Sequence, residues 1–249
     1  MKRRQPRLPP YFYLRGHAML EFFLSLPYTV QALIATLFTW ALTALGAGAV
    51  FLFKKPAGAL LDAALGAAAG VMTAASFFSL LAPASELARE LGMNETAALL
   101  TGFLGGGVLL YAGDRLYERL NRRGSRRAAM LVASVTLHNI PEGLSVGVAF
   151  GALAFDIPGA SLGAACLLAL GIGVQNLPEG MAVSVPLRAE GMSRGRAFAI
   201  GQLSGAVEPI AGVAGAAIAL AARGALPALL SFAAGAMLYV VVAELIPES

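Results

Sequence analysis

The sequence predicts an all-α polytopic membrane protein, and two observations lead to that fold class. Of its 249 residues 58% are hydrophobic and only 13% are charged, with a mean hydropathy of +0.74, whereas soluble domains carry about 25% charged residues. The chain also contains seven apolar stretches close to the roughly 20 residues that a membrane-spanning helix needs. The single cysteine, Cys166, excludes an internal disulfide and a cysteine-based metal site.

Clusters of charged and turn-forming residues separate the expected helices. Lys54-Lys55-Pro56 divides the first two apolar stretches, and the basic stretch 115–127 divides the third from the fourth. The seven expected spans are 27–53, 57–82, 97–117, 128–151, 158–187, 196–221 and 225–247. Residues 27–249 are therefore predicted to form one transmembrane domain. Residues 1–26 form a basic N-terminal segment, which we expect at the membrane surface or interface, with contact to anionic lipid as the functional alternative.

The distribution of lysine and arginine predicts the orientation, because these residues are enriched in short cytoplasmic connections. Outside the N-terminal tail, eleven lie on one side of the predicted topology and two, Arg89 and Arg223, on the other. The side that carries the connection 115–127 is therefore expected to be cytoplasmic, which places the N-terminus outside. The basic tail argues the other way, but the short connections agree with one another.

Two near-copies of one hexapeptide lie inside apolar helices, at residues 138–143 (HNIPEG) and 175–180 (QNLPEG). In each copy the first and fifth residues are four positions apart, so they share one helix face about one turn apart. The asparagines are one position further along, on an adjacent face. The prolines remove a backbone donor and disturb the preceding turn, and freed carbonyls are tolerated in a membrane where they line a cavity or bind an ion.

The residue types in this pattern indicate a divalent-metal site. Imidazole with carboxylates suits Zn²⁺, and amide oxygens add neutral ligands that suit harder ions. Glu142 and Glu179 supply the two negative charges that offset one divalent cation in a low-dielectric site. The candidate ligands are His138, Asn139, Glu142, Gln175, Asn176 and Glu179. The alternative is that these polar groups only join the helices, and the repeated pattern of prolines and glutamates favours the metal site.

A third acid next to a proline, Glu208-Pro209, lies near the centre of the sixth predicted span. Intramembrane acids are expensive and usually functional. We expect Glu208 to belong to the same site or to a neighbouring one. A proton relay or a helix–helix hydrogen bond is the rival interpretation.

These motifs resemble those of the ZIP family of divalent-metal transporters (Zrt/Irt-like proteins), in particular its bacterial GufA-like branch. The resemblance also includes residues 75–83 (ASFFSLLAP) and 244–248 (ELIPE), and covers about 27–249, the expected metal-transport domain. It implies a two-metal site between the fourth, fifth and sixth spans, with Glu179 bridging. The implied primary ligands are His138, Glu142, Gln175 and Glu179, and the implied second set is Asn139, Asn176, Glu179 and Glu208. Along the path, Ser79 and Glu86 resemble entrance residues, and Glu244 an exit residue.

The sequence departs from the family pattern in places. Asn176 stands where some relatives carry Asp, which removes a negative charge from the second metal position. The connection 115–127 lacks the histidines that many relatives have there. The family normally has eight spans, so seven of an expected eight are present.

We therefore expect a multi-pass transporter of the bacterial inner membrane that imports Zn²⁺ by alternating access. Cd²⁺, Fe²⁺ or Mn²⁺ are further candidate substrates, and uptake is expected to weaken below about pH 6. A metal-gated channel or sensor is the open alternative. An intramembrane metalloprotease is disfavoured, because the chain lacks a His-Glu-x-x-His motif, and no enzymatic activity is expected. The expected partners are the metal ion, the lipid bilayer and a second copy of the chain in a homodimer. We expect no nucleic-acid partner and no organic cofactor.

Overall fold

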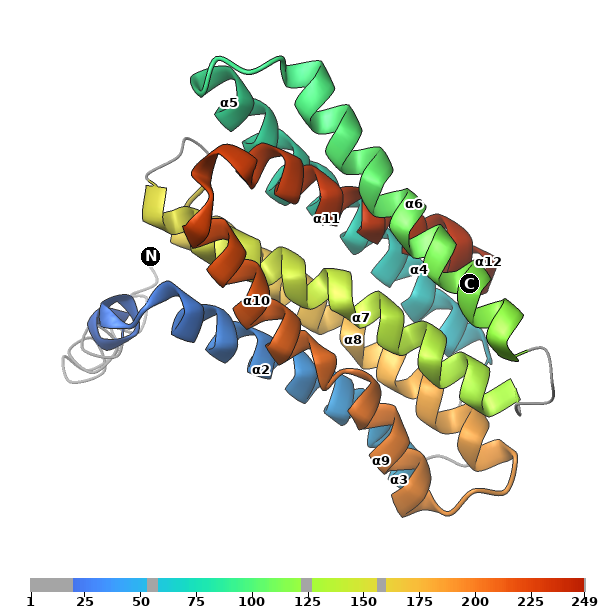
Figure 1. Cartoon of the computed structure of the whole chain (residues 1–249). Coiled ribbons are helices and arrows are strands. Elements are labelled where there is room, and N and C mark those ends of the chain that lie inside the picture. The colour runs from blue at the N-terminus through green and yellow to red at the C-terminus, as the bar shows by residue number, and fades with distance from the viewer. Residues whose placement is uncertain (1–19, 53–57, 122–126, 156–159, 249) are drawn as a thin grey trace, which may run out of the picture.

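The computed structural model describes residues 20–52, 58–121, 127–155 and 160–248, and these ranges contain helices and no strand (Figure 1). The predicted all-α class is therefore confirmed. The elements are α2 (Tyr28–Ala47), α3 (Ala49–Leu52), α4 (Gly58–Ala75), η1 (Ser76–Leu81), α5 (Ala82–Glu90), α6 (Glu95–Asn121), α7 (Arg127–Ala152), η2 (Leu153–Phe155), α8 (Leu162–Ala189), α9 (Arg194–Ser204), α10 (Val207–Ala221), η3 (Arg223–Ala225), α11 (Leu226–Val240), η4 (Val241–Leu245) and α12 (Ile246–Glu248).

Six helical rods in the described ranges are long and apolar enough to cross a membrane, one fewer than the seven predicted. They are Tyr28–Leu52, Ala69–Glu90, Glu95–Leu116, Leu162–Ala189, Arg194–Ala221 and Arg223–Ala243. The predicted span 128–151 is not among the six. It forms α7, a continuous helix of 26 residues that carries His138, Asn139 and Glu142 at the centre of the bundle.

Two predicted boundaries also differ from the structure. The second rod continues past Pro83 to Glu90. The π-helical turn η1 directly precedes α5 and Pro83, and such local π adjustments allow a membrane helix to continue through a proline. The sixth predicted span is broken by a turn at 205–206 between α9 and α10. Glu208 consequently lies in the first turn of α10.

Local capping signals determine where several helices begin and end. The side chains of Asn94, Ser161 and Ser193 accept hydrogen bonds from backbone N–H groups three residues later, at the starts of α6, α8 and α9. Gly92 and Gly191 follow the ends of α5 and α8 with φ of 65° and 96°. Glycine adopts this left-handed conformation without steric cost.

The helices form two groups. The site bundle consists of α2, α7, α8 and α10, with α9 at one end, and the flanking layer consists of α4, η1, α5, α6 and α11. Helix α10 packs on α7 and α2, α2 packs on α8, and α11 packs on α6, while α4 and α11 join the layer to α8 and α7. Figure 1 shows α6 and α11 along one side, and α2 and α10 on the other.

Glycines allow these helices to approach closely in both groups. A Cβ atom added to Gly147 of α7 would lie 2.0 Å from the carbonyl oxygen of Gly212 in α10, and one added to Gly46 of α2 would lie 2.0 Å from that of Leu177 in α8. In the flanking layer, Gly106 approaches the Phe232 carbonyl in the same way. Small residues at such crossings are typical of membrane helix packing.

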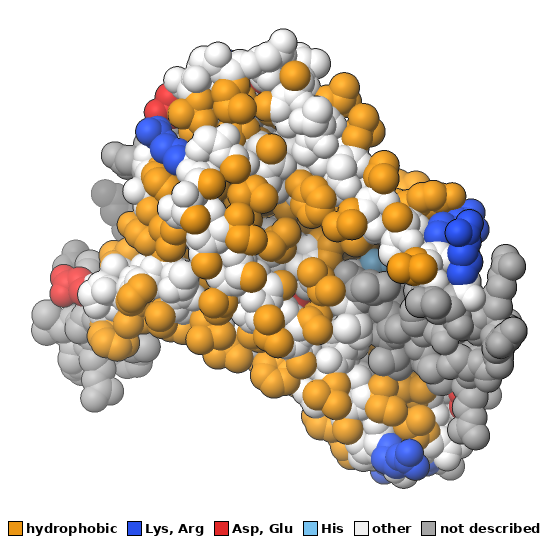
Figure 2. Space-filling model, viewed as in Figure 1, with side chains coloured by type: hydrophobic (Ala, Val, Ile, Leu, Met, Phe, Trp, Pro, Cys, Tyr) orange, Lys and Arg blue, Asp and Glu red, His pale blue; other side chains and the backbone are white. Residues whose placement is uncertain are grey.

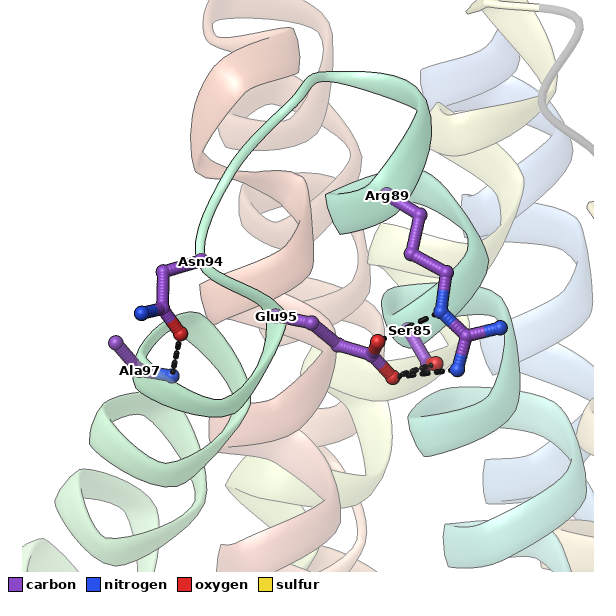
Figure 3. Close-up of polar contacts among 5 residues, drawn as sticks. All are labelled: Ser85, Arg89, Asn94, Glu95 and Ala97. Carbon is purple, nitrogen blue, oxygen red and sulfur yellow. Dashed lines mark hydrogen bonds and ion pairs between the residues drawn. The ribbon is translucent and has the colours of Figure 1, made fainter.

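Charged side chains lie at the ends of the rods, and hydrophobic side chains cover much of the surface between them (Figure 2). Between α5 and α6, the guanidinium of Arg89 donates to Glu95 over 2.6 and 2.8 Å, and Ser85 donates to the same carboxylate (Figure 3). Arg223 donates to Glu90 over 2.8 Å. This pair shows that the end of α5 and the start of α11 lie at one end of the molecule, as the predicted topology requires.

Candidate metal site

The two hexapeptides lie on neighbouring helices of the site bundle. Pro141 and Pro178 are inside α7 and α8, which remain continuous helices around them. The glycines that end the motifs bring other helices close. A Cβ atom on Gly143 would lie 2.4 Å from the carbonyl oxygen of Glu208, and one on Gly180 would lie 2.2 Å from that of Thr43. The motif glycines thus place α10 and α2 against the candidate ligands.

Glu142 and Gln175 form the direct link between the two motifs. Both side chains are buried, and Nε2 of Gln175 donates to Oε1 of Glu142 over 2.7 Å. Within the described residues, neither Oε2 of Glu142 nor Oε1 of Gln175 accepts a hydrogen bond. Buried acceptors are nearly always satisfied. Two oxygens from the two predicted motifs are therefore available to a cation.

Glu179 and Glu208 lie near this pair. Both are buried, and both are close enough to interact electrostatically with Glu142. Three carboxylates without a cation between them would repel one another in a low-dielectric interior. Their proximity favours positive charge at the same place.

The asparagines of the motifs hold their amide groups in fixed orientations. Nδ2 of Asn139 donates to the carbonyl oxygen of Ser204 over 2.9 Å, and Nδ2 of Asn176 donates to both carboxylate oxygens of Glu208 at 3.0 Å. The Oδ1 atoms of both asparagines are buried and accept no hydrogen bond from the described residues. Each amide therefore uses its NH₂ group on the protein and leaves its oxygen without a donor among the described residues.

Two residues of α2 that contact Glu208 were not predicted from the sequence. The hydroxyls of Thr39 and Thr43 both donate to its carboxylate, the second over 3.2 Å. The helix–helix hydrogen bond that was the rival interpretation for Glu208 is thus present. Two hydroxyls four residues apart in an apolar helix were the available signal, but the sequence gives no hint that they face α10.

Asp114 of α6 is another residue that sequence analysis did not select. Its Oδ2 accepts a hydrogen bond from the Tyr239 hydroxyl over 2.9 Å, and its Oδ1 lies 3.9 Å from Nε2 of His138. His138 is buried. The contact joins the flanking layer to the site bundle at a candidate ligand. An acid inside the third predicted span was the signal that could have revealed it.

Within the described residues, no three His, Cys, Asp or Glu side chains are grouped closely enough to hold a metal ion by themselves. Amide oxygens would therefore have to complete the coordination. The path residues are dispersed. Ser79 is half-buried in η1, Glu86 is exposed on α5, and the Glu244 side chain lies outside the described part of the structure. The roles of all these residues stay predictions.

The comparisons with known proteins agree with the motif resemblance. A family model described as ZIP Zinc transporter matches residues 117–249. The chain is 39% identical to Zinc transporter ZIP11 of Homo sapiens, over 88% of this chain and 89% of that protein. It is 38% identical to Zinc transporter GufA of Myxococcus xanthus, over 87% of each. Against Zinc transporter ZIPB of Bordetella bronchiseptica it is 37% identical, over 84% of this chain and 70% of that protein.

Proposed function

Because the chain belongs to the ZIP family, we propose that it imports Zn²⁺ into the cytoplasm through the buried site between α7, α8 and α10. Its relatives ZIP11, GufA and ZIPB are each named zinc transporters. Transport requires only one ion in this site, held by the four implied primary ligands His138, Glu142, Gln175 and Glu179. Cd²⁺, Fe²⁺ and Mn²⁺ are further candidate substrates, because nitrogen and oxygen ligands accept several divalent metals.

The observation that carries this proposal is the pair of buried oxygens without hydrogen-bond donors, Oε2 of Glu142 and Oε1 of Gln175. Leaving a buried acceptor unsatisfied costs about 1–3 kcal/mol, and more for a charged group. A bound cation would satisfy both atoms, and Glu142 and Glu179 would offset its charge. If the polar groups served only to join helices, these two oxygens would be expected to have donors.

The arrangement also favours alternating access between two groups of helices. A small cavity of about 20 Å³ lies between η1, α7 and α8 and is lined by Ser79, Pro83 and Ser161. It has room for about one water molecule, so passage of an ion past Ser79 requires the groups to move apart. The glycine crossings keep the site bundle together during such a motion. The contact between Asp114 of the flanking layer and His138 of the site bundle would change during this motion.

We place the transporter in a bacterial inner membrane on the basis of its similarity to GufA, and with its N-terminus outside on the basis of the lysine and arginine distribution. The entry path would run past Glu86 and Ser79, and the exit path past Glu244. Residues 1–26 would lie at the membrane surface, and 27–249 would form the transport domain, alone or as a homodimer.

Uptake of radiolabelled Zn²⁺ into proteoliposomes tests the proposal. Uptake that saturates with Zn²⁺ concentration supports a transporter, whereas flux that rises linearly over the same range indicates the channel alternative. We expect His138→Ala and Glu179→Ala to abolish saturable uptake. Unchanged uptake in both variants would refute the site. Competition by Fe²⁺, Mn²⁺ and Cd²⁺ in the same assay would rank the substrates.

A further inference from the structure

The hydrogen bonds of Glu208 bear on how many ions the site holds. We propose that the amide of Asn176 and the hydroxyls of Thr39 and Thr43 occupy the Glu208 carboxylate, so that the site binds one divalent ion rather than two. Glu208 is then a positioning residue that orients Asn176. This inference rests on the metal site proposed above and deepens it.

The two buried glutamates Glu142 and Glu208 differ in their partners. Both carboxylate oxygens of Glu208 receive donors, with Nδ2 of Asn176 at 3.0 Å from each, Thr43 at 3.2 Å from Oε1 and Thr39 on Oε2. Glu142 has one amide donor, Gln175, and its Oε2 has none among the described residues. Glu142 therefore has a free oxygen for a metal ion, and Glu208 would have to lose existing hydrogen bonds to bind one.

The packing around Glu208 leaves little room for an ion. The turn between α9 and α10 lies directly against the carboxylate, so that a Cβ atom on Gly205 would come within 2.9 Å of both Oε1 of Glu208 and Oγ1 of Thr43. The Glu208 side chain is fully buried. An ion here would have to displace protein atoms from three helices.

The charges are compatible with this stoichiometry. With the three buried glutamates, one divalent ion leaves a net charge of −1 and two leave +1, and unbalanced charge is costly in a buried site unless hydrogen bonds stabilise it. One ion is balanced by Glu142 and Glu179, while neutral donors stabilise Glu208. The oxygens of Asn139 and Asn176 can extend the coordination of the single ion, but they cannot offset the charge of another.

Asn176 also explains why Glu208 is directed away from the ion. Its NH₂ group donates to Glu208 and to the backbone carbonyl oxygen of Thr39, the latter over 3.2 Å. The amide oxygen must then lie on the opposite side of the side-chain plane, away from Glu208. An aspartate at 176 would have no NH₂ group to donate and would add a negative charge. Asn176→Asp should therefore open the second position to an ion.

The test is the number of ions bound by the purified full chain in detergent, counted by elemental mass spectrometry after equilibrium dialysis against Zn²⁺. We expect one saturably bound ion in the unmodified protein and two in Asn176→Asp. The matched control is Asn94→Asp, which adds the same charge where residue 94 caps α6 outside the site, and it should stay at one.

Two ions bound to the unmodified protein would overturn the inference, and that count needs no variant to fold. One ion in a well-folded Asn176→Asp protein would overturn it too, because the substitution removes the amide donor, leaves Glu208 only the two threonine hydroxyls and adds the negative charge that a second ion needs. Failure of the proposed function gives a different result. If the proposed site is wrong, the double variant His138→Ala with Glu142→Gln would still bind as many ions as the unmodified protein, whether that number is one or two.

Discussion

The site bundle and the flanking layer are packed in the same way but differ in what they bury. Glycine crossings hold both together, Gly147 on Gly212 in the bundle and Gly106 on Phe232 in the layer. Among the described residues, the layer buries two polar side chains, Ser76 and Ser231. The bundle buries Gln31, Thr36, Thr39, Thr43, His138, Asn139, Glu142, Ser145, Gln175, Asn176, Glu179, Ser184, Ser204 and Glu208.

This difference distinguishes the residues that pack the helices from the polar residues that packing does not require. The layer shows that close helix association in this protein needs glycines and apolar side chains and does not need buried charge. The polar groups of the bundle therefore require another explanation, and a transported cation supplies one. In the layer, the ion pairs Arg89–Glu95 and Arg223–Glu90 lie at the exposed end of the helices.

Removing one carboxylate from each region should give the largest difference in Zn²⁺ uptake between the site bundle and the flanking layer. Glu142→Gln keeps the shape of the side chain but removes a charged ligand, and we expect Zn²⁺ affinity and uptake to fall by about 100-fold, the upper end of what changes around metal sites cost. Binding by calorimetry and uptake in proteoliposomes would measure it.

The matched control is Glu95→Gln in the flanking layer. It disturbs the contacts with Arg89 and Ser85, but exposed ion pairs contribute little, so uptake should stay within about twofold. Equal losses in the two variants would contradict the division of roles between bundle and layer.

Acidification should affect the function of the bundle before the stability of the protein. Protons compete with the metal for carboxylates and imidazole, so uptake should fall on the order of tenfold between about pH 7.5 and about pH 5.5. The melting temperature of the metal-free protein, followed by circular dichroism, controls for unfolding. Transport that remains constant over this range would argue against ligands of these types.

Glycine substitutions should show that the layer depends on close packing as the bundle does. Gly106→Ala would force a Cβ atom to within 2.0 Å of the Phe232 carbonyl oxygen, and such overpacking costs about 1–3 kcal/mol. Gly113 lies in the same helix with nothing within 4 Å of an added Cβ atom, so Gly113→Ala should be neutral or stabilise the helix by up to about 1 kcal/mol. Thermal unfolding in detergent compares the two variants, and equal melting temperatures would disprove the close approach of α6 to α11 at Gly106.

Much of the fold and part of the site followed from the sequence. Apolar stretches near 20 residues predicted most of the rods. The repeated hexapeptide predicted one site shared by two helices, and Glu142 and Gln175 of the two motifs are hydrogen-bonded in the structure. The turn at 205–206 was missed, although Gly205 and the proline at 209, which lies in the first turn of α10, are signals of a helix break. The extension of the second rod to Glu90 was missed because the residues after 82 are less apolar, although their backbone stays helical.

The sequence by itself determined the membrane class, the helices and the residue types that a cation requires, because composition, helical period and ligand chemistry belong to short stretches of chain. Only the tertiary structure decided the partners of those residues. Thr39 and Asn176 reach Glu208 from positions 169 and 32 residues away, and Asp114 reaches His138 from another helix group. Such contacts depend on which helix faces meet, and the close approaches of glycines on different helices set those faces.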